Sequence, residues 1–310
     1  MNKAQAKQLL RHVSLRQLQI FDAIVRLGSF TRAAKELYIT QPTVSMQIKK
    51  LERSVGLPLF EQIGKQNYLT EAGKIIRMHT QQVLDALANM EMEIADIQGL
   101  KTGHLRLAVV TTAKYFAPRA LGKFCELYPG VDVSLKVTNR ERLLQRLEDN
   151  ADDLYILGHP PQSNDVIFEP YLDNPLVVLA PRNHPLAGKV DIEPKQLAEY
   201  PFIMREPGSG TRMATEEFFT QHKTELNIRM ELGSNEAIKH AIDAGLGISV
   251  LSIHTLNLEG VKGPLVRLDV KGFPLSWQWH VGHNKGKHLS VIAKTFLHFI
   301  KTESDSIMRN

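Results

Sequence analysis

Residues 29–45, which read SFTRAAKELYITQPTVS, decide the fold of the N-terminal part of the chain. Two short helices separated by a tight turn fit this segment. Ser29 is a favourable N-cap for the first helix and Thr40 for the second, because their hydroxyl oxygens can accept free backbone N–H groups. Pro42 lies in the first turn of the second helix, where its missing N–H costs nothing.

The sequence on either side completes a small domain. From Ser14, apolar residues recur at helical spacing until Gly28 ends that helix. The helix after Thr40 has an inward apolar face formed by Val44, Ile48, Leu51 and Val55, and it ends at Gly56. Residues 59–69 are interpreted as a two-stranded wing around Gly64. Three short helices followed by a hairpin with a basic tip form a winged helix-turn-helix pattern.

The positive charge of the chain is concentrated in this N-terminal quarter. The net charge is +5 over 310 residues, and residues 1–74 hold 12 Lys and Arg against 5 Asp and Glu. The remaining residues hold 26 against 28, so the whole positive excess lies in the small module. A basic module joined to a near-neutral body predicts a polyanion partner. Double-stranded DNA is favoured over a membrane surface, because no basic amphipathic anchor helix is evident.

A single long helix is predicted from Thr70 to about Leu100, a range that holds no Pro and has Gly only at Gly73 near its start and Gly99 near its end. Its apolar residues follow a heptad spacing, with Thr80 in one slot. The members of this seam are Ile76, Val83, Leu87, Met90, Ile94 and Ile97. The seam favours self-association of the chain as a dimer or a tetramer. Packing against the chain's own C-terminal part is the alternative.

Strands and helices alternate after Gly103. The predicted strands are 105–110, 131–137, 154–157, 176–180, 202–204, 228–232 and 248–251, and the predicted helices are 115–128, 140–147, 213–222 and 236–244. This order predicts an α/β fold with parallel sheets covered by helices. Stretches near 158–175 and 265–275 are interpreted as crossovers between two lobes. A ligand cleft is expected beyond the carboxyl ends of the strands.

The chain is therefore divided into four parts. They are an N-terminal extension (1–12), a winged helix-turn-helix DNA-binding domain (13–70), a linker and dimerisation helix (71–100) and a two-lobed effector-binding domain (103–310). Within the last part, lobe I is predicted at about 103–160 and 275–305, and lobe II at about 175–268.

Several motifs resemble the N-terminal signature of LysR-type transcriptional regulators. They are the segments 29–37 (SFTRAAKEL), 40–45 (TQPTVS), 56–61 (GLPLFE) and 69–73 (LTEAG). The resemblance implies a linker helix and a two-lobed domain like a periplasmic binding protein. The segments 152–157 (DDLYIL), 202–212 (FIMREPGSGTR) and 231–239 (ELGSNEAIK) are similar to regulators of RuBisCO operons and of inorganic-carbon uptake. The family commonly has Arg where this chain has Met46 and Gln62, so those arginine contacts are not transferred.

The helix after Thr40 is the candidate for reading base edges in the major groove. Gln41 at its start suits adenine, whereas Lys and Arg side chains suit phosphates, which give affinity without sequence choice. The candidate DNA-binding residues are Ser29, Thr31, Arg32, Thr40, Gln41, Pro42, Thr43, Ser45, Met46, Lys49, Lys50, Gln62 and Lys65. The alternative is that these are merely solvated polar residues of a surface.

In the C-terminal part, several strands end in small polar residues that open helices. Free N–H groups at helix N-termini bind anions and arginine adds charge-assisted hydrogen bonds, so the predicted effector is a small anionic metabolite. A phosphorylated sugar or sugar acid of carbon fixation is what the resemblance implies. The candidate effector-binding residues are Thr111, Thr112, Lys114, Thr138, Asn139, Arg205, Gly208, Ser209, Gly210, Thr211, Ser234 and Asn235. Ordinary helix capping is the alternative interpretation of the Ser, Thr and Asn residues.

Other functions find less support. His280, His283 and His288 have no Cys or carboxylate neighbours in the sequence, so neither a metal site nor a cofactor is predicted. No paired carboxylates or activated nucleophile are evident, and an enzyme is not expected. One cysteine, a polar N-terminus and the lack of an apolar run of roughly 20 residues indicate a cytoplasmic protein without a membrane partner. A solute-binding protein or an enzyme on the two-lobed fold is the alternative, and RNA polymerase is a further partner to consider for a regulator.

Overall fold

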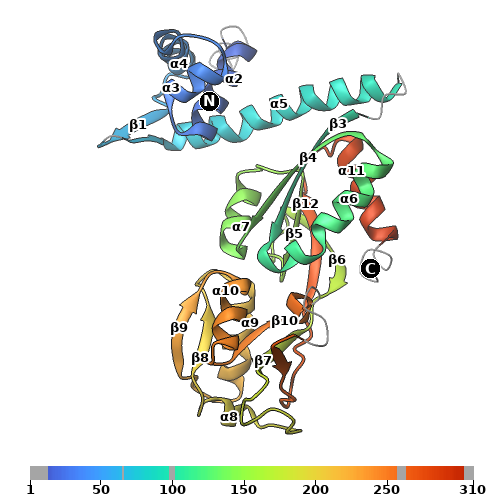
Figure 1. Ribbon diagram of the computed structural model, residues 1–310. Helices are drawn as coiled ribbons and strands as arrows, with labels where there is room; N and C mark the ends of the chain where they lie inside the picture. Colours follow the sequence, from blue (N-terminus) through green and yellow to red (C-terminus); the bar gives the residue numbers. More distant parts are fainter. Residues whose placement is uncertain (1–12, 65, 98–101, 257–262, 304–310) are drawn as a thin grey trace. The chain divides into compact units, whose positions relative to one another are not determined.

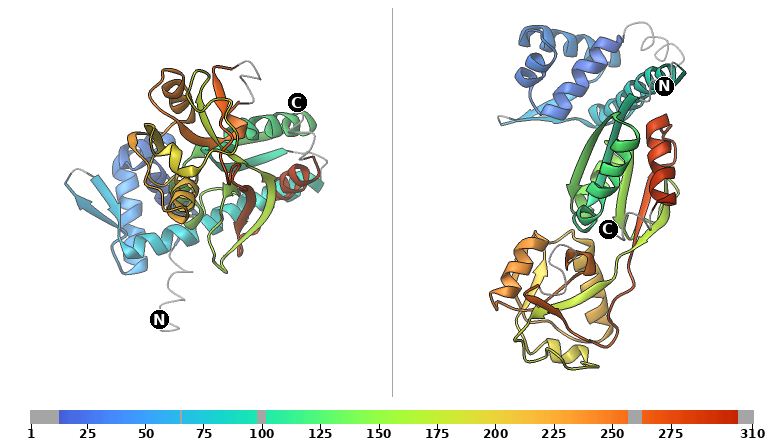
Figure 2. Two further views of the ribbon diagram at one scale, coloured as in Figure 1. Left: turned by 90° about the horizontal axis from the view of Figure 1, so that it is seen from below. Right: turned by 45° about the vertical axis from the view of Figure 1, so that its right-hand side comes forward.

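The computed structural model describes residues 13–64, 66–97, 102–256 and 263–303, and of residues 95–97 it describes the backbone alone. The chain divides into two compact units, Met1–Glu91 and Met92–Asn310 (Figures 1 and 2). The predicted N-terminal extension and Lys65 lie outside the described residues. Within the described ranges, no helix is both long enough and apolar enough to span a bilayer.

The first unit begins with three helices whose ends are fixed by capping residues. They are α2 (Leu15–Leu27), α3 (Phe30–Glu36) and α4 (Gln41–Val55). The side chains of Ser14, Ser29 and Thr40 each accept a backbone N–H group in the first turn of the helix that follows. Gly28 and Gly56 adopt the left-handed conformation at the ends of α2 and α4. The predicted helix starts and stops are confirmed.

The core of this unit extends into the wing. Phe21 is fully buried, and its ring centroid lies 5.3 Å from that of Phe60, which also contacts the Phe30 ring at 5.5 Å. Phe60 begins β1 (Phe60–Ile63), which pairs antiparallel with β2 (Gln66–Leu69). The base of the predicted hairpin is therefore anchored to α2 and α3, while the side chains toward its tip are exposed.

The long helix α5 (Glu71–Ile97) follows the wing directly. A Cβ atom on Gly73 would lie 2.2 Å from the carbonyl oxygen of Leu59, so only glycine allows the helix to approach the strand so closely. The Thr70 hydroxyl accepts the Gly73 N–H at 3.0 Å and donates to the Pro58 carbonyl at 2.7 Å. These contacts give a physical reason for the Leu-Thr-Glu-Ala-Gly motif of the sequence.

The predicted heptad seam of α5 is only partly covered within one chain. Thr80 is 2% exposed, whereas Val83 is 43%, Met90 51% and Ile94 49% exposed. A row of large apolar side chains thus remains open to solvent along the helix, as expected of a surface that meets a second helix.

The second unit contains a five-stranded sheet with the strand order β4-β3-β5-β12-β6. The strands are β3 (Thr102–Val110), β4 (Gly130–Thr138), β5 (Leu154–Gly158), β6 (Val166–Asp173) and β12 (Gln278–Asn284). The helices of this lobe are α6 (Ala117–Leu127), α7 (Arg140–Glu148) and α11 (Val291–Thr302). Helix α6 connects β3 to β4 on one side, and α7 connects β4 to β5 in the opposite direction along the sheet. Because such connections are right-handed, the two helices lie on opposite faces of the sheet. α11 contacts α6, so both cover the same face (Figure 1).

The prediction of parallel sheets is only partly right. β3 pairs parallel with β4 and β5, but β12 is antiparallel to both β5 and β6. The segment 158–175, interpreted from sequence as a crossover, contains β6, and lobe I therefore extends to Asp173. Pro170 lies within β6, and a proline argues against a strand in sequence-based prediction. It is tolerated here because β6 is an edge strand, whose outer N–H groups have no neighbouring strand to pair with.

Lobe II is a second α/β layer structure. Its strands are β7 (Leu176–Pro181), β8 (Phe202–Arg205), β9 (Ile228–Leu232), β10 (Ser249–Ser252) and β11 (Leu265–Arg267), and its helices are α8 (Pro194–Leu197), α9 (Gly210–Gln221) and α10 (Asn235–Asp243). Alternate residues of β7 belong to different cores. Val178 packs in the core that contains Phe218 of α9, whereas Val177 packs in the core that contains Ile238 of α10. The continuous apolar sequence of β7 reflects this burial on both faces. Here too β7 is antiparallel to its neighbours β10 and β11.

Two chain segments cross between the lobes side by side. One joins β6 to β7, and the other leads from β11 to β12. Asn174 donates its backbone N–H to the Trp277 carbonyl at 2.7 Å, and Leu176 and Leu275 exchange two backbone hydrogen bonds at 3.1 and 2.9 Å. The crossovers therefore form a paired ribbon beside the space between the lobes.

Candidate functional site

The first unit carries the predicted DNA-binding residues on α3, α4 and the wing. Nine of them are exposed, namely Thr31, Arg32, Thr40, Gln41, Pro42, Met46, Lys49, Lys50 and Gln62. Ser29, Thr43 and Ser45 are half-buried. Ser29 and Thr40 are helix caps, so part of their hydrogen-bonding capacity is used locally. Gln41 donates from Nε2 to the Ser45 hydroxyl at 3.1 Å, which aligns its side chain along α4.

The outer face of α4 is polar and basic. Val44, Ile48 and Leu51 are buried, as predicted, and this rotation leaves Lys49 and Lys50 in solvent. Neither ammonium group forms an ion pair with a described residue. The two lysines are suited to contacts with the phosphate backbone of DNA. Gln41 and Met46, exposed on the same helix, are suited to contacts with base edges in a groove.

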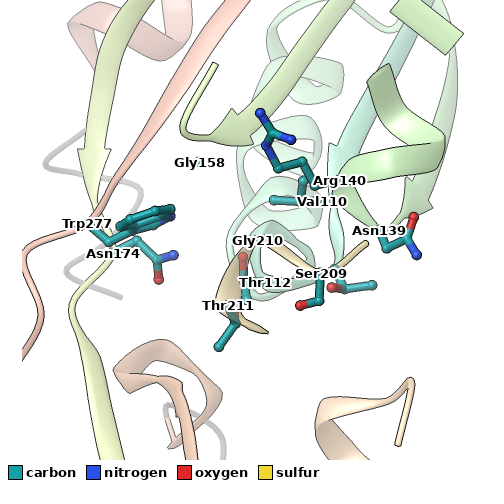
Figure 3. A pocket seen from close by; sticks show the side chains of 11 residues that line it. Val110, Thr112, Asn139, Arg140, Gly158, Asn174, Ser209, Gly210, Thr211 and Trp277 are labelled. Carbon is teal, nitrogen blue, oxygen red and sulfur yellow. The ribbon is translucent and has the colours of Figure 1, made fainter. Parts of the chain in front are cut away.

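The second unit contains a cavity between its two lobes and beside the crossovers (Figure 3). Lobe I, lobe II and the crossover ribbon all contribute to its lining. The lining residues are Val110, Thr111, Thr112, Asn139, Arg140, Gly158, Asn174, Ser209, Gly210, Thr211 and Trp277. None of them is acidic. A cavity lined by hydroxyls, amides and one guanidinium is suited to an anion.

The start of α9 is the strongest local anion-binding feature of this cavity. Ser209 occupies the N-cap position, but its side chain accepts no N–H group of the helix. The N–H groups of the first turn are therefore free for another acceptor, and the positive end of the helix dipole adds to them. By contrast, Asn139 caps α7 by accepting the Arg142 N–H at 3.0 Å.

Arg140 is the only basic residue that lines the cavity. Its Nε and Nη2 atoms donate to the His159 carbonyl at 3.1 and 3.0 Å, which orients the guanidinium and leaves Nη1 without a described partner. Arg140 forms no ion pair with any described residue. Burial lowers the pKa of Arg140, yet a guanidinium stays charged in proteins. An uncompensated, half-buried positive charge thus lies at the cavity.

Six of the twelve predicted effector residues line the cavity, and six do not. The six in the lining are Thr111, Thr112, Asn139, Ser209, Gly210 and Thr211. The others, Lys114, Thr138, Arg205, Gly208, Ser234 and Asn235, lie outside the lining. Sequence reasoning missed Val110, Arg140, Gly158, Asn174 and Trp277. Arg140 carried a usable signal, because it directly follows the helix cap Asn139 that was selected.

Arg205, a predicted effector residue, lies outside the lining of the cavity and is bonded within the protein. It is 1% exposed and pairs with Glu206, with Nε 2.7 Å from Oε2. Its Nη1 donates to Asn235 Oδ1 at 2.6 Å, and its Nη2 donates to the Thr111 hydroxyl of the other lobe at 3.1 Å. The Arg205 charge is therefore compensated within the protein, and the side chain joins the two lobes beside the cavity.

Two further contacts hold the lobes together at this edge. Tyr115 donates its hydroxyl proton to Glu236 Oε1 at 2.6 Å, and Lys114 lies 3.5 Å from the same oxygen. Burial and the contact with Glu236 raise the pKa of Tyr115, so the phenol keeps this proton at neutral pH. The Glu141 N–H also donates to the Gly208 carbonyl at 3.1 Å. Lys114 and Gly208 thus serve contacts between the lobes.

The described residues contain no group of three or more His, Cys, Asp or Glu side chains arranged to hold a metal ion. His280 and His283 both lie on β12. They are three positions apart, so the alternation of side chains along a strand places them on opposite faces of the sheet.

A basic winged helix-turn-helix unit and a two-lobed unit with an anion-suited cavity together define a DNA-binding regulator with a sensory domain. Two family models match the chain. The model described as "Bacterial regulatory helix-turn-helix protein, lysR family" matches residues 15–74, and the model "LysR substrate binding domain" matches residues 98–305. The chain therefore belongs to the LysR family of bacterial transcription regulators.

Individual relatives are similar over nearly the whole chain. It is 50% identical over 298 residues to the HTH-type transcriptional activator CmpR of Synechocystis sp., covering 96% of this chain and 98% of the relative. It is 50% identical over 291 residues to the RuBisCO operon transcriptional regulator of Acidithiobacillus ferrooxidans, covering 94% of each. The solved CcmR regulatory domain of Synechocystis PCC6803 in complex with 2-PG is 54% identical, with a TM-score of 0.63, covering 65% of this chain and 97% of that one.

Proposed function

We propose that this LysR-type regulator controls genes of carbon fixation or inorganic-carbon uptake in response to a small phosphorylated acid, with 2-phosphoglycolate (2-PG) as the first candidate. The observation that carries the proposal is the uncompensated Arg140 guanidinium beside the uncapped start of α9, in a cavity without acidic residues. The names of relatives that share about half of its residues supply the gene class, and the 2-PG complex of the CcmR domain supplies the candidate ligand.

In this proposal the phosphate lies at the junction of the lobes. The free N–H groups of Gly210 and Thr211 in lobe II and the Arg140 guanidinium in lobe I donate to its oxygens. The Thr112 hydroxyl, which already accepts the Trp279 indole N–H at 3.1 Å, is free to donate its own proton to the ligand. Because donors from both lobes meet one anion, binding favours the closed arrangement of the lobes.

The DNA-binding residues proposed from the sequence complete the mechanism. Gln41, Met46 and their neighbours at the start of α4 read base edges, while Arg32, Lys49 and Lys50 contact phosphates. The exposed seam of α5 pairs two chains, so that two winged helices meet two half-sites. The chain acts in the cytoplasm, where its DNA target lies, and has no enzymatic activity.

Genome-wide footprinting tests this function directly. We expect the occupied sites to lie upstream of carbon-fixation or carbon-uptake genes, and 2-PG to change the extent of the footprint, whereas glycolate and glucose leave it unchanged. Occupied sites unrelated to such genes, or a footprint that is indifferent to 2-PG, would argue against the proposal.

The phosphate contacts of α4 give a second expected result. Replacing both Lys49 and Lys50 with Ala should lower affinity for a footprinted DNA fragment and reduce the slope of log affinity against log salt by about 1.8, because each phosphate contact contributes about 0.9. Titrations at several salt concentrations measure this slope.

The matched control replaces Lys189 and Lys195 with Ala. Both are exposed lysines of lobe II, so the net charge changes equally. An equal loss of slope in both double variants would mean that α4 has no special contact with DNA.

A further inference from the structure

The cavity has a second polar wall that the phosphate site at Arg140 and α9 leaves unused. Asn174, on the crossover from β6 to β7, lines the cavity and is only 2% exposed. Its backbone N–H holds the two crossovers together through the Trp277 carbonyl. Its side-chain amide makes no hydrogen bond to any described residue, and Oδ1 is fully buried.

A buried amide without partners is rare, because leaving such a group unpaired is costly. Five buried side-chain atoms in the described residues lack a hydrogen-bond partner, belonging to Thr80, Tyr171, Asn174, Asn235 and His280. Among these residues, Asn174 alone lines the cavity. Figure 3 shows its amide directed into the cavity beside Trp277, across from Arg140, Asn139 and Ser209. The fully buried atom is the acceptor Oδ1, whereas Nδ2 has no described partner and is the donor end of the amide that points into the cavity, where a ligand would lie.

The surroundings of Asn174 favour a negatively charged partner. No acidic side chain lines the cavity to accept from its amide. The Trp277 indole closes this end and lies so near Gly158 that a Cβ atom there would be 2.2 Å from Nε1. An amide N–H₂ group and an indole N–H at a site without acceptors suit a carboxylate.

We infer that Asn174 binds the end of the effector opposite its phosphate, so that the site selects acids with a phosphate at one end and a carboxylate at the other. The inference rests on the proposed function, which places the phosphate at Arg140 and the start of α9. Since Asn174 lies on a crossover, its bond to the carboxylate links the ligand to the ribbon that joins the lobes.

A comparison of two ligands on the full chain tests this assignment. Ethyl phosphate keeps the phosphate monoester of 2-PG but lacks the carboxylate. Calorimetry with wild-type protein should give tighter binding of 2-PG than of ethyl phosphate, by about tenfold for one hydrogen bond to a charged group. Asn174→Ala should weaken 2-PG by about this factor and leave ethyl phosphate unchanged, so that the preference disappears. Asn174→Asp, which keeps the size but repels a carboxylate, should weaken 2-PG further.

The matched control is Asn164→Ala, which removes the same group from an exposed loop position and should bind both ligands as the wild type does. If Asn174→Ala keeps the wild-type preference for 2-PG, or loses both ligands by an equal factor, the assignment of Asn174 is wrong while the phosphate site stands. If wild-type protein binds neither ligand, the proposed function itself fails.

Discussion

Replacing Arg140 with Gln is expected to weaken 2-PG binding about 100-fold. Arg140 is the only basic residue in the lining of the cavity and has no acidic partner among the described residues. Two charge-assisted hydrogen bonds to a phosphate are worth about 3 kcal/mol together, which corresponds to about two powers of ten in affinity. Calorimetry of the full chain measures the affinity, and the effect of 2-PG on the footprint measures the regulatory response.

The matched control is Arg142→Gln on the same helix. Arg142 is exposed, and its described contact is made by its backbone N–H to Asn139. This variant should bind 2-PG as the wild type does. Both variants should bind DNA with wild-type affinity when no effector is present, because Arg140 lies in the second unit. Wild-type affinity for 2-PG in Arg140→Gln would show that the phosphate lies elsewhere.

The N-terminal fold could be predicted because its signals are local. A hydroxyl that can cap a helix, a glycine that can end one and a proline in a first turn each act within a few residues. Ser14, Ser29, Thr40, Gly28 and Gly56 therefore marked the helix ends correctly. The wing was predicted for the same reason, since Gly64 marks the reversal between two strands that are neighbours in the sequence and pair with each other.

The parallel order of the C-terminal strands was overestimated because pairing is a long-range property. β12 follows β6 by more than a hundred residues yet lies between β5 and β6 in the sheet. Nothing in the local sequence of β12 indicates its direction. The strand β6 was missed since Pro170 normally argues against a strand, and its edge position is visible only in the assembled sheet.

The residues of the candidate site also fall into those with a local sequence signal and those whose position depends on the three-dimensional fold. Helix starts such as Ser209–Thr211 were identified because capping residues are recognisable in sequence. Arg205 was selected and Arg140 was not, because the difference between them appears only in three dimensions. Arg205 bonds to Glu206, Asn235 and Thr111. Among the described residues, Arg140 donates side-chain hydrogen bonds only to the His159 carbonyl. Asn174 lies in an irregular crossover with no periodic pattern, so its position at the cavity follows only from the three-dimensional pairing of the crossovers.

Placing charge on the α5 seam is expected to have the largest effect on DNA binding. In Val83→Glu/Met90→Glu, both replaced side chains are exposed in one chain, so the fold of the first unit should be retained. In a paired helix the new carboxylates would be buried near their own copies, which disfavours association strongly. We expect monomers by light scattering. Loss of the second half-site contact should weaken binding to the footprinted DNA by at least about 1000-fold, the typical margin between specific and non-specific binding.

The control places the same two charges off the seam, in Gln82→Glu/Ala88→Glu. Both positions are exposed, and a helix with 3.6 residues per turn directs them away from Val83 and Met90. This variant should keep the mass and the DNA affinity of the wild type. An unchanged mass for Val83→Glu/Met90→Glu would instead mean that the open seam packs against another part of the same chain, the alternative that the heptad pattern left undecided. If both variants dissociate equally, added negative charge anywhere on α5 separates the chains. Burial of that charge at a seam would then not be the cause.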